Sequence, residues 1–108
     1  MDFITLPVEM ITYLHDENGT KIYYPQVNGL SNSEIQRKIN EQIIDEVNHL
    51  INEQYSEQNT NTFAEMIGTF EIKTNERNIL SFTLSNYAIR DSAAHGLTLM
   101  KSLTLNTE

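Results

Sequence analysis

An apolar residue recurs at every third or fourth position through the middle of the chain, and this stripe limits the folds open to it. Its members are Ile35, Ile39, Ile43, Val47, Leu50 and Ile51. The spacing places these residues on one side of an α-helix, with mostly charged and polar residues elsewhere on its surface. Such a helix needs an apolar surface to pack on, so the rest of the chain must supply one.

The predicted helix has recognisable ends. Ser31 followed by Glu34 forms the pattern of a capping box, and Leu30 and Ile35 occupy the positions of a hydrophobic staple. We expect the helix to fade within residues 54–61, because polar residues there interrupt the apolar spacing.

Beyond the helix, apolar and polar residues alternate with a period of two, which is typical of half-buried strands. The pattern predicts strands over residues 63–73, 80–85 and 97–105, joined by a hairpin loop at 74–78 and a loop at 90–96. The side chains expected to point inward from the last two strands are Leu80, Phe82, Leu84, Leu97, Leu99, Leu103 and Leu105.

The residues before the helix predict a hairpin. Residues 3–14 are rich in β-branched and aromatic types, and Pro7 within them favours an edge strand or a bulge. The turn at residues 16–19 contains Asn-Gly, which supplies the positive φ angles of a tight hairpin. A second strand should therefore cover residues 20–24 and end at Pro25.

Together these elements predict an α+β fold. We expect an antiparallel sheet of about five strands, in the order strand-strand-helix-strand-strand-strand, with one long amphipathic helix packed on one face. The 108 residues suffice for one hydrophobic core, so residues 1–108 are expected to form a single domain. The chain stops almost within its last predicted strand, which suggests that the natural protein continues past a domain boundary.

Charge and composition narrow the classes of partner. The formal net charge is −8, and the 7 Lys and Arg residues form no basic stripe, so nucleic acid is not an expected partner. A cationic protein would be attracted, although an acid excess also serves solubility. The absence of cysteine excludes disulfides and thiolate metal sites. No apolar run could span a bilayer, and the first residues lack the features of a secretion signal.

The histidines provide little basis for catalysis or metal binding. His15 lies beside the first predicted turn, His49 on the helix and His95 in the loop before the last strand, so none share a metal-ligand spacing. We interpret the first two as surface residues. His95 lies among small residues that would let a backbone or a ligand approach, so it is a stronger candidate for contact with a ligand.

Enzymatic patterns are equally weak. The chain contains no Gly-x-Ser-x-Gly elbow, and Asp91, Ser92 and His95 share one loop, whereas catalytic triads converge from separate segments. Glu41 and Asp45 lie one helical turn apart on a solvated face, which does not indicate a glycosidase. We therefore predict no catalytic residues, no metal site and no cofactor.

Tyrosines are the remaining candidates for binding. Each offers a rigid apolar face with a hydroxyl group, which suits a surface that recognises protein or sugar, although packing in a strand is the commoner role. Residues predicted to contribute to binding are Tyr23, Tyr24, Tyr87, His95 and Gly96.

Several segments, taken together and in order, resemble a known family. They are the segment from Ile22 to Leu30, then Ile39-Asn40, then Leu80-Ser81-Phe82 continuing to Tyr87, and finally Ala93-Ala94-His95-Gly96. This pattern is similar to the extracytoplasmic domain of RsiV-type anti-sigma factors and PdaC-type peptidoglycan deacetylases. The family often has paired glycines where Ser92 and Ala93 stand here.

The resemblance implies a location and a role. It implies a domain facing the cell envelope of a Gram-positive bacterium, tethered by a membrane helix or lipid outside this chain and followed by a neighbouring C-terminal domain. In the anti-sigma branch such a domain binds lysozyme, whereas in the deacetylase branch it is an accessory domain without catalytic metal ligands. The expected partner is therefore a lysozyme-like protein or peptidoglycan.

Three functional hypotheses remain open from the sequence. The first is a non-catalytic recognition module for a cell-wall-associated ligand. The second is a structural or oligomerising domain that positions its C-terminal neighbour. The third is a small hydrolase that uses His95 with Ser92 or Asp91; if His95 is structural instead, we expect it to tie its loop to a backbone carbonyl group.

Overall fold

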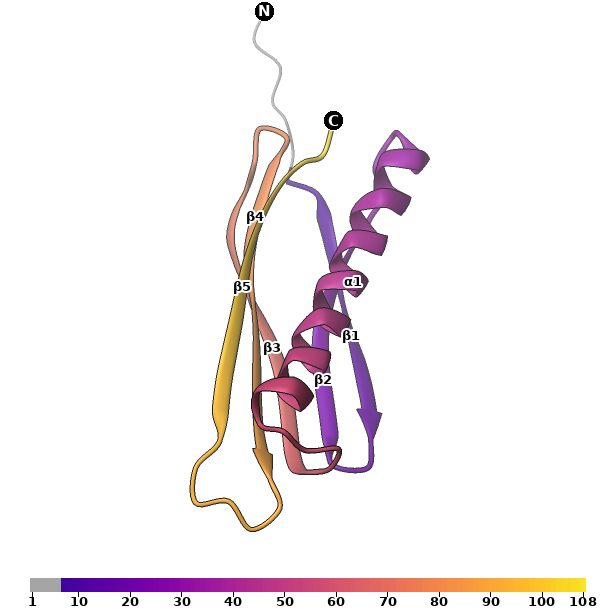
Figure 1. The fold of residues 1–108 in the computed structure, drawn as a ribbon. Helices are drawn as coiled ribbons and strands as arrows, with labels where there is room; N and C mark the ends of the chain where they lie inside the picture. Colours follow the sequence, from indigo (N-terminus) through magenta and orange to yellow (C-terminus); the bar gives the residue numbers. More distant parts are fainter. Residues whose placement is uncertain (1–6) are drawn as a thin grey trace, which may run out of the picture.

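The computed structural model describes residues 7–108, which form a long sheet with one helix along it (Figure 1). The elements are β1 (Glu9–Glu17), β2 (Thr20–Asn28), α1 (Ser33–Glu57), β3 (Phe63–Glu76), β4 (Ile79–Arg90) and β5 (Leu97–Asn106). The predicted element order and the α+β class are confirmed. Residues 3–6 of the first predicted strand lie outside the described part, and Pro7 precedes β1 instead of lying within it.

The sheet is mixed, so the prediction of a purely antiparallel sheet is wrong. Its strand order is β1-β2-β3-β4-β5, and β2 pairs with β3 in parallel over residues 20–22 and 66–68. The reason is the course of α1, which carries the chain from the end of β2 back to the level where β2 began (Figure 1). β3 therefore starts beside the start of β2 and runs in the same direction, as in a strand-helix-strand unit.

Two asparagine side chains complete the hydrogen bonding where β2 and β3 separate. The Val27 N–H donates to Asn40 Oδ1 at 2.7 Å, and Asn40 Nδ2 donates to the Val27 carbonyl at 3.0 Å. Asn75 makes the same pair of bonds with the backbone of Val8, both at 2.9 Å. We call these contacts the asparagine clamps. They tie the β1–β2 hairpin to α1 and β3 beyond the short parallel ladder.

The core lies between α1 and the sheet. Its larger cluster contains Val27, Ile39, Ile43, Leu50, Leu80, Phe82, Leu84 and Leu103. Its smaller cluster contains Ile22, Met66 and Ala88, with Val47 and Ile51 of α1 packed against it. The stripe residues of α1 therefore contact residues of β2, β3, β4 and β5. In β4, buried residues alternate strictly with half-buried ones, so one face of this strand points toward α1 and the other away.

The start of α1 differs from the predicted capping box. The N-cap is Asn32, whose Oδ1 accepts hydrogen bonds from the N–H groups of Glu34 and Ile35 at 3.0 and 3.1 Å. Ser and Asn are both favoured N-cap residues. In this chain the N-cap is Asn32 and not its neighbour Ser31. Leu30 and Ile35 both pack against the larger core cluster.

The end of α1 also differs, because the helix stays regular to Glu57. Gln54, predicted to lie where the helix fades, is fully buried. Its Nε2 donates to the carbonyl groups of Asn86 and Leu97 at 3.0 and 2.8 Å. Gln58 Nε2 donates to Gln54 Oε1 and to the Ala88 carbonyl. Glutamine side chains thus anchor the last turn to β4 and β5, which an apolar periodicity does not reveal.

The first hairpin turn lies where the sequence predicts it, whereas the second is shorter than predicted. Asn18 and Gly19 form the predicted first turn, with φ angles of 46° and 83°. The second turn contains only Arg77 and Asn78, at φ angles of 53° and 65°, so the predicted loop at 74–78 is too long. The predicted end of the second strand at Pro25 is wrong, because β2 continues to Asn28. Proline is tolerated there because β3 pairs with β2 only up to residue 22, so no strand needs a hydrogen bond from the N–H that Pro25 lacks.

Candidate functional site

One face of the sheet points away from α1, and we call it the open face. In β4 it carries Ser81, Thr83, Ser85, Tyr87 and Ile89, which alternate with the buried residues. Residues opposite one another in neighbouring strands share a face. The strand register therefore assigns further residues to the open face. These are Ile67 opposite Tyr87, Lys21 opposite Ile67, Asp16 opposite Lys21, Leu14 opposite Tyr23, and Met100 opposite Ser85.

Five apolar or aromatic residues of this face lie directly or diagonally opposite one another in the strand register. The open-face patch consists of Leu14, Tyr23, Ile67, Tyr87 and Met100. Four of them are exposed, from 36% for Ile67 to 66% for Met100, and Tyr87 is half-buried between Ile67 and β5. Because contiguous apolar surface in water is costly, such patches commonly mark interaction sites.

Polar groups that can form hydrogen bonds lie beside the patch near Met100. A shallow hollow of about 360 Å³ lies along β3 to β5. It is lined by Thr69, Phe70, Glu71, Lys73, Thr83, Ser85 and Met100. Lys73 Nζ lies 3.0 Å from Glu71 Oε1, so the hollow is bordered by an ion pair and by hydroxyl groups. Apolar anchors with a polar rim are typical of surfaces that bind proteins or sugars.

The structure brings two predicted binding residues into contact, Tyr87 and Gly96. A Cβ atom at Gly96 would lie 2.4 to 2.6 Å from Cε2, Cζ and Oη of Tyr87. The ring therefore lies against the backbone of Gly96, and only glycine leaves it that space. Gly96 thus determines where the Tyr87 ring can sit at the border of the open-face patch.

The predicted pair Tyr23 and Tyr24 is divided between the two faces of β2. Tyr23 belongs to the open face and is 40% exposed. Tyr24 points to the other side, where its ring stacks on that of Tyr13 with a centroid distance of 5.8 Å and an interplanar angle of 20°. Tyr24 also packs against the smaller core cluster. Its role in the structure is therefore packing around β1 and β2.

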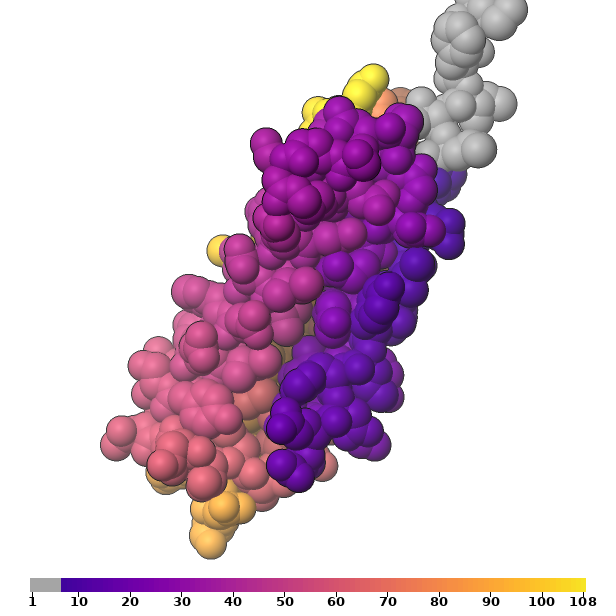
Figure 2. All heavy atoms as spheres, turned by 90° about the vertical axis from the view of Figure 1, so that its right-hand side faces the viewer, coloured from indigo at the N-terminus to yellow at the C-terminus, as the bar shows by residue number. Residues whose placement is uncertain are grey.

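His95 belongs to the loop between β4 and β5, and this loop projects beyond the end of α1 (Figures 1 and 2). The side chain is exposed and borders a hollow of about 490 Å³ that also includes Glu57, Arg90 and Ser92. Within residues 7–108 no hydrogen bond of the His95 ring is present, so the expected tie to a backbone carbonyl is not seen. Ser92 has a φ of 65°, a conformation that favours glycine.

The other histidines lie apart from this loop. His15 Nε2 is 3.4 Å from Glu17 Oε2 at the first hairpin, and His49 is exposed on α1. In the part of the chain that the structure describes, no group of three or more His, Cys, Asp or Glu side chains is arranged to hold a metal ion.

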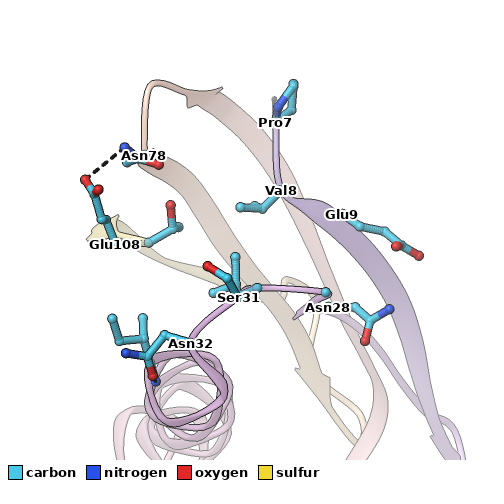
Figure 3. Close-up of a pocket in the computed structure, with 12 residues that line it drawn as sticks. Pro7, Val8, Glu9, Asn28, Ser31, Asn32, Asn78 and Glu108 are labelled. Carbon is cyan, nitrogen blue, oxygen red and sulfur yellow. Dashed lines mark hydrogen bonds between the residues drawn. The ribbon is translucent and has the colours of Figure 1, made fainter. Parts of the chain in front are cut away.

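The two largest remaining hollows lie at opposite ends of the molecule. The upper one, about 540 Å³, is bordered by the start of α1, the start of β1 and the Asn78–Glu108 side-chain hydrogen bond of 3.0 Å (Figure 3). The lower one, about 480 Å³, lies between the first hairpin and the end of α1, which Figure 2 shows side by side. Neither is lined by a residue predicted to bind a ligand.

Sequence reasoning missed three members of the open-face patch: Leu14, Ile67 and Met100. A signal existed at Ile67, which stands among Glu65, Thr69 and Glu71 on the polar side of its strand. An apolar residue on a polar face is the kind of exception that marks a contact surface.

Comparison with known proteins gives one family. The family model described as deacetylase PdaC matches residues 15–98. No curated protein matches the chain. Among the described residues, the one helix is too polar to cross a lipid bilayer.

Proposed function

Because the chain belongs to the deacetylase PdaC family, as its sequence segments suggested, we propose that it is a non-catalytic recognition module of a Gram-positive cell-envelope protein. The module lies outside the cytoplasm, where the full-length protein is held by a membrane or lipid anchor. It binds a cell-wall-associated ligand, either a lysozyme-like protein or peptidoglycan. The observation that carries this proposal is the open-face patch.

The patch supports recognition for a physical reason. Tyr23 and Tyr87 each present a flat apolar ring with a hydroxyl group, and both arise from strands, which hold them more rigidly than loops would. Sugar rings and protein side chains both stack on such surfaces. The net charge of −8 adds long-range attraction for a cationic protein such as lysozyme.

Titration calorimetry with lysozyme and with soluble muropeptides, each at low and high salt, tests the proposal. We expect heat with one of the two ligands. Lysozyme binding should weaken as salt rises, because charge attraction is screened. Absence of binding to both ligands would overturn the proposal.

Matched variants locate the binding surface. Tyr23→Ala and Ile67→Ser remove apolar groups from the open-face patch, and each should weaken binding at least tenfold. Tyr13→Ala and Ile44→Ser are their controls, because Tyr13 and Ile44 are similarly exposed but lie outside the patch. Equal losses in both sets would show that the open-face patch is not the binding surface.

A catalytic role has its own test, because the family name refers to deacetylation. We expect no release of acetate when the chain is incubated with acetylated peptidoglycan, with and without added divalent metal ions. Acetate release that is lost in His95→Ala would instead support the hydrolase hypothesis.

The alternative function is an accessory domain that positions its C-terminal neighbour. It draws on the same patch, since uncovered apolar surface also suits an intramolecular contact. Light scattering of the chain with and without the natural continuation distinguishes the two. Protection of Ile67 and Met100 by the neighbouring domain, together with no response to either ligand, would favour this alternative.

A further inference from the structure

Asn86 is a polar residue within the apolar core. It lies on the side of β4 that faces α1, is only 2% exposed and stands between the buried residues Leu84 and Ala88 along the strand. Within residues 7–108 its Oδ1 atom has no hydrogen-bond partner. A buried oxygen without a partner costs stability, so native proteins nearly always supply one, either a protein group or an ordered water molecule.

The sheet divides close to Asn86. The parallel pairing of β2 with β3 ends at Ile22 and Gly68, and Gly68 lies directly opposite Asn86 in the neighbouring strand. A small cavity lies at this point, between the sheet and α1. Its lining includes Ile22, Gly68 and Asn86 from the sheet and Val47 and Leu50 from α1. The unpartnered side chain and the cavity therefore lie together at the end of the parallel ladder.

The cavity has the size and the surroundings of a site for one water molecule. Its volume is about 10 Å³, and one water molecule requires about 10–15 Å³. A buried water also needs about two to four polar partners. Asn86 supplies one. Tyr23 and Thr69, the first residues after the last β2–β3 pair, also line the cavity and carry backbone hydrogen-bonding groups.

We propose that one ordered water molecule occupies this cavity. It donates a hydrogen bond to Asn86 Oδ1 and makes its remaining bonds to the backbone of β2 and β3, where these strands separate. Asn86 is then a satisfied polar residue, and its position in an otherwise apolar layer has a physical reason. The water bridges β4 to both of the diverging strands.

This water adds a contact where β2 and β3 are joined by few hydrogen bonds. Only three residue pairs form their ladder, and the asparagine clamps act farther along the two strands. Tyr23 lines the cavity and also contributes to the open-face patch, so the water stabilises the sheet behind that patch. The site goes beyond the recognition function proposed above and does not depend on whether the patch binds a ligand.

NMR cross-relaxation between water and protein tests the site in the unaltered chain. We expect cross-peaks from water to the side-chain amide protons of Asn86 and to the α protons of Gly68, with the sign of a water that stays bound longer than the molecule takes to tumble. The side-chain amide of Gln54 is the control. It is buried in the same core but does not line the cavity, and it donates to two backbone carbonyl groups, so it should show no such cross-peak.

Two variants test whether Asn86 holds the water. Asn86→Leu replaces the acceptor with an apolar group of similar size, and Val47→Ile adds a methyl group from the side of α1. Each should abolish the water cross-peak at Gly68. Absence of water cross-peaks at Asn86 and Gly68 in the unaltered chain would overturn the proposal, since an amide satisfied by the protein in another orientation needs no water. A cross-peak at Gly68 that persists in Asn86→Leu would also overturn it.

Discussion

Gly96 shows how one residue can control the open-face patch. A side chain here would occupy the space of the Tyr87 ring. We expect Gly96→Ala to displace that ring and to lower the free energy of unfolding by about 1–2 kcal/mol, as overpacking does. Chemical denaturation measures the loss, and the ring resonances of Tyr87 report the displacement.

The reason for that loss can be checked by a double-mutant cycle. In a Tyr87→Ala background the space above Gly96 is free, so Gly96→Ala should cost much less there. An equal cost in both backgrounds would show that the strain lies in the backbone and not against the ring.

Ser92 provides a second prediction in the same loop. Its φ of 65° is unfavourable for a residue with a Cβ atom. Ser92→Gly should therefore raise the free energy of unfolding by up to about 1 kcal/mol, with the flexibility of glycine in the unfolded chain reducing the gain. Thermal denaturation measures it, and Ala93→Gly is the control because Ala93 is not at positive φ. A gain of the same size in Ala93→Gly would contradict this explanation.

Individual site residues were only partly predictable. Tyr23, Tyr87 and Gly96 could be selected by residue type and by family segments, and the structure places all three at the open face or its border. Met100 and Leu14 could not be selected, because an apolar residue in a strand is ordinarily buried. Their exposure depends on which face α1 leaves uncovered, and that is a property of the assembled sheet.

At the scale of elements, the start of α1 carries a measurable charge effect. Hydrogen bonding from Arg37 holds the pKa of Glu34 below its ordinary value of 4.5. A lowered pKa in the folded state means that the Glu34 carboxylate stabilises the fold above its ordinary pKa. This contribution is lost as the pH falls through the folded-state value.

Arg37→Ala should therefore raise the pKa of Glu34 toward its ordinary value. Titration of the Glu34 side-chain carboxyl resonance by NMR measures the change. Lys38→Ala is the control, because Lys38 is the smallest contributor to the shift and should change it little. An unchanged pKa in Arg37→Ala would show that the helix terminus itself is responsible.

The short junction between β2 and β3 depends on Gly68. A Cβ atom there would lie 2.7 Å from Cγ2 and 3.3 Å from Cα of Ile22. Both residues are buried and the Ile22 backbone belongs to the ladder, so Gly68→Ala should destabilise the fold by about 1–3 kcal/mol. Urea denaturation measures the loss. It should be smaller in an Ile22→Ala background; additive losses would rule out the steric explanation.

Elements were predictable where local chemistry decides them. The Asn18-Gly19 turn and the alternation of Leu80, Phe82 and Leu84 appear where their patterns place them. The extension of β2 through Pro25 was not predictable, because it depends on how far β3 accompanies β2. Likewise, α1 reaches Glu57 because Gln54 and Gln58 bond to strands distant in the sequence.

At the scale of the molecule, the parallel pairing of β2 and β3 has a general cause. α1 contains 25 residues, which at about 1.5 Å per residue is enough to return the chain along the length of the nine-residue strand β2. The succession of a strand, a long helix and a strand thus already indicated parallel neighbours. The asparagine clamps carried no such signal, because an asparagine that bonds to a distant backbone looks like any polar residue in the sequence.

The clamps predict how the molecule opens. Only three residue pairs join β2 to β3, so beyond them the β1–β2 hairpin is held by Asn40, Asn75 and side-chain packing. In the variant Asn40→Ala/Asn75→Ala, the backbone groups of Val27 and Val8 lose their partners. We expect a loss of about 2–4 kcal/mol, from about 1–2 kcal/mol for each clamp.

Hydrogen exchange should show that this loss is local. Amides of β1 and of residues 23–28 should exchange faster in the double variant, while those in the middle of β4 change much less, since β4 is paired on both sides. Asn48→Ala, on the exposed side of α1, should leave both groups unchanged. Equal acceleration in β1 and β4 would mean that the sheet opens as one unit and that the clamps stabilise the whole fold instead of one hairpin.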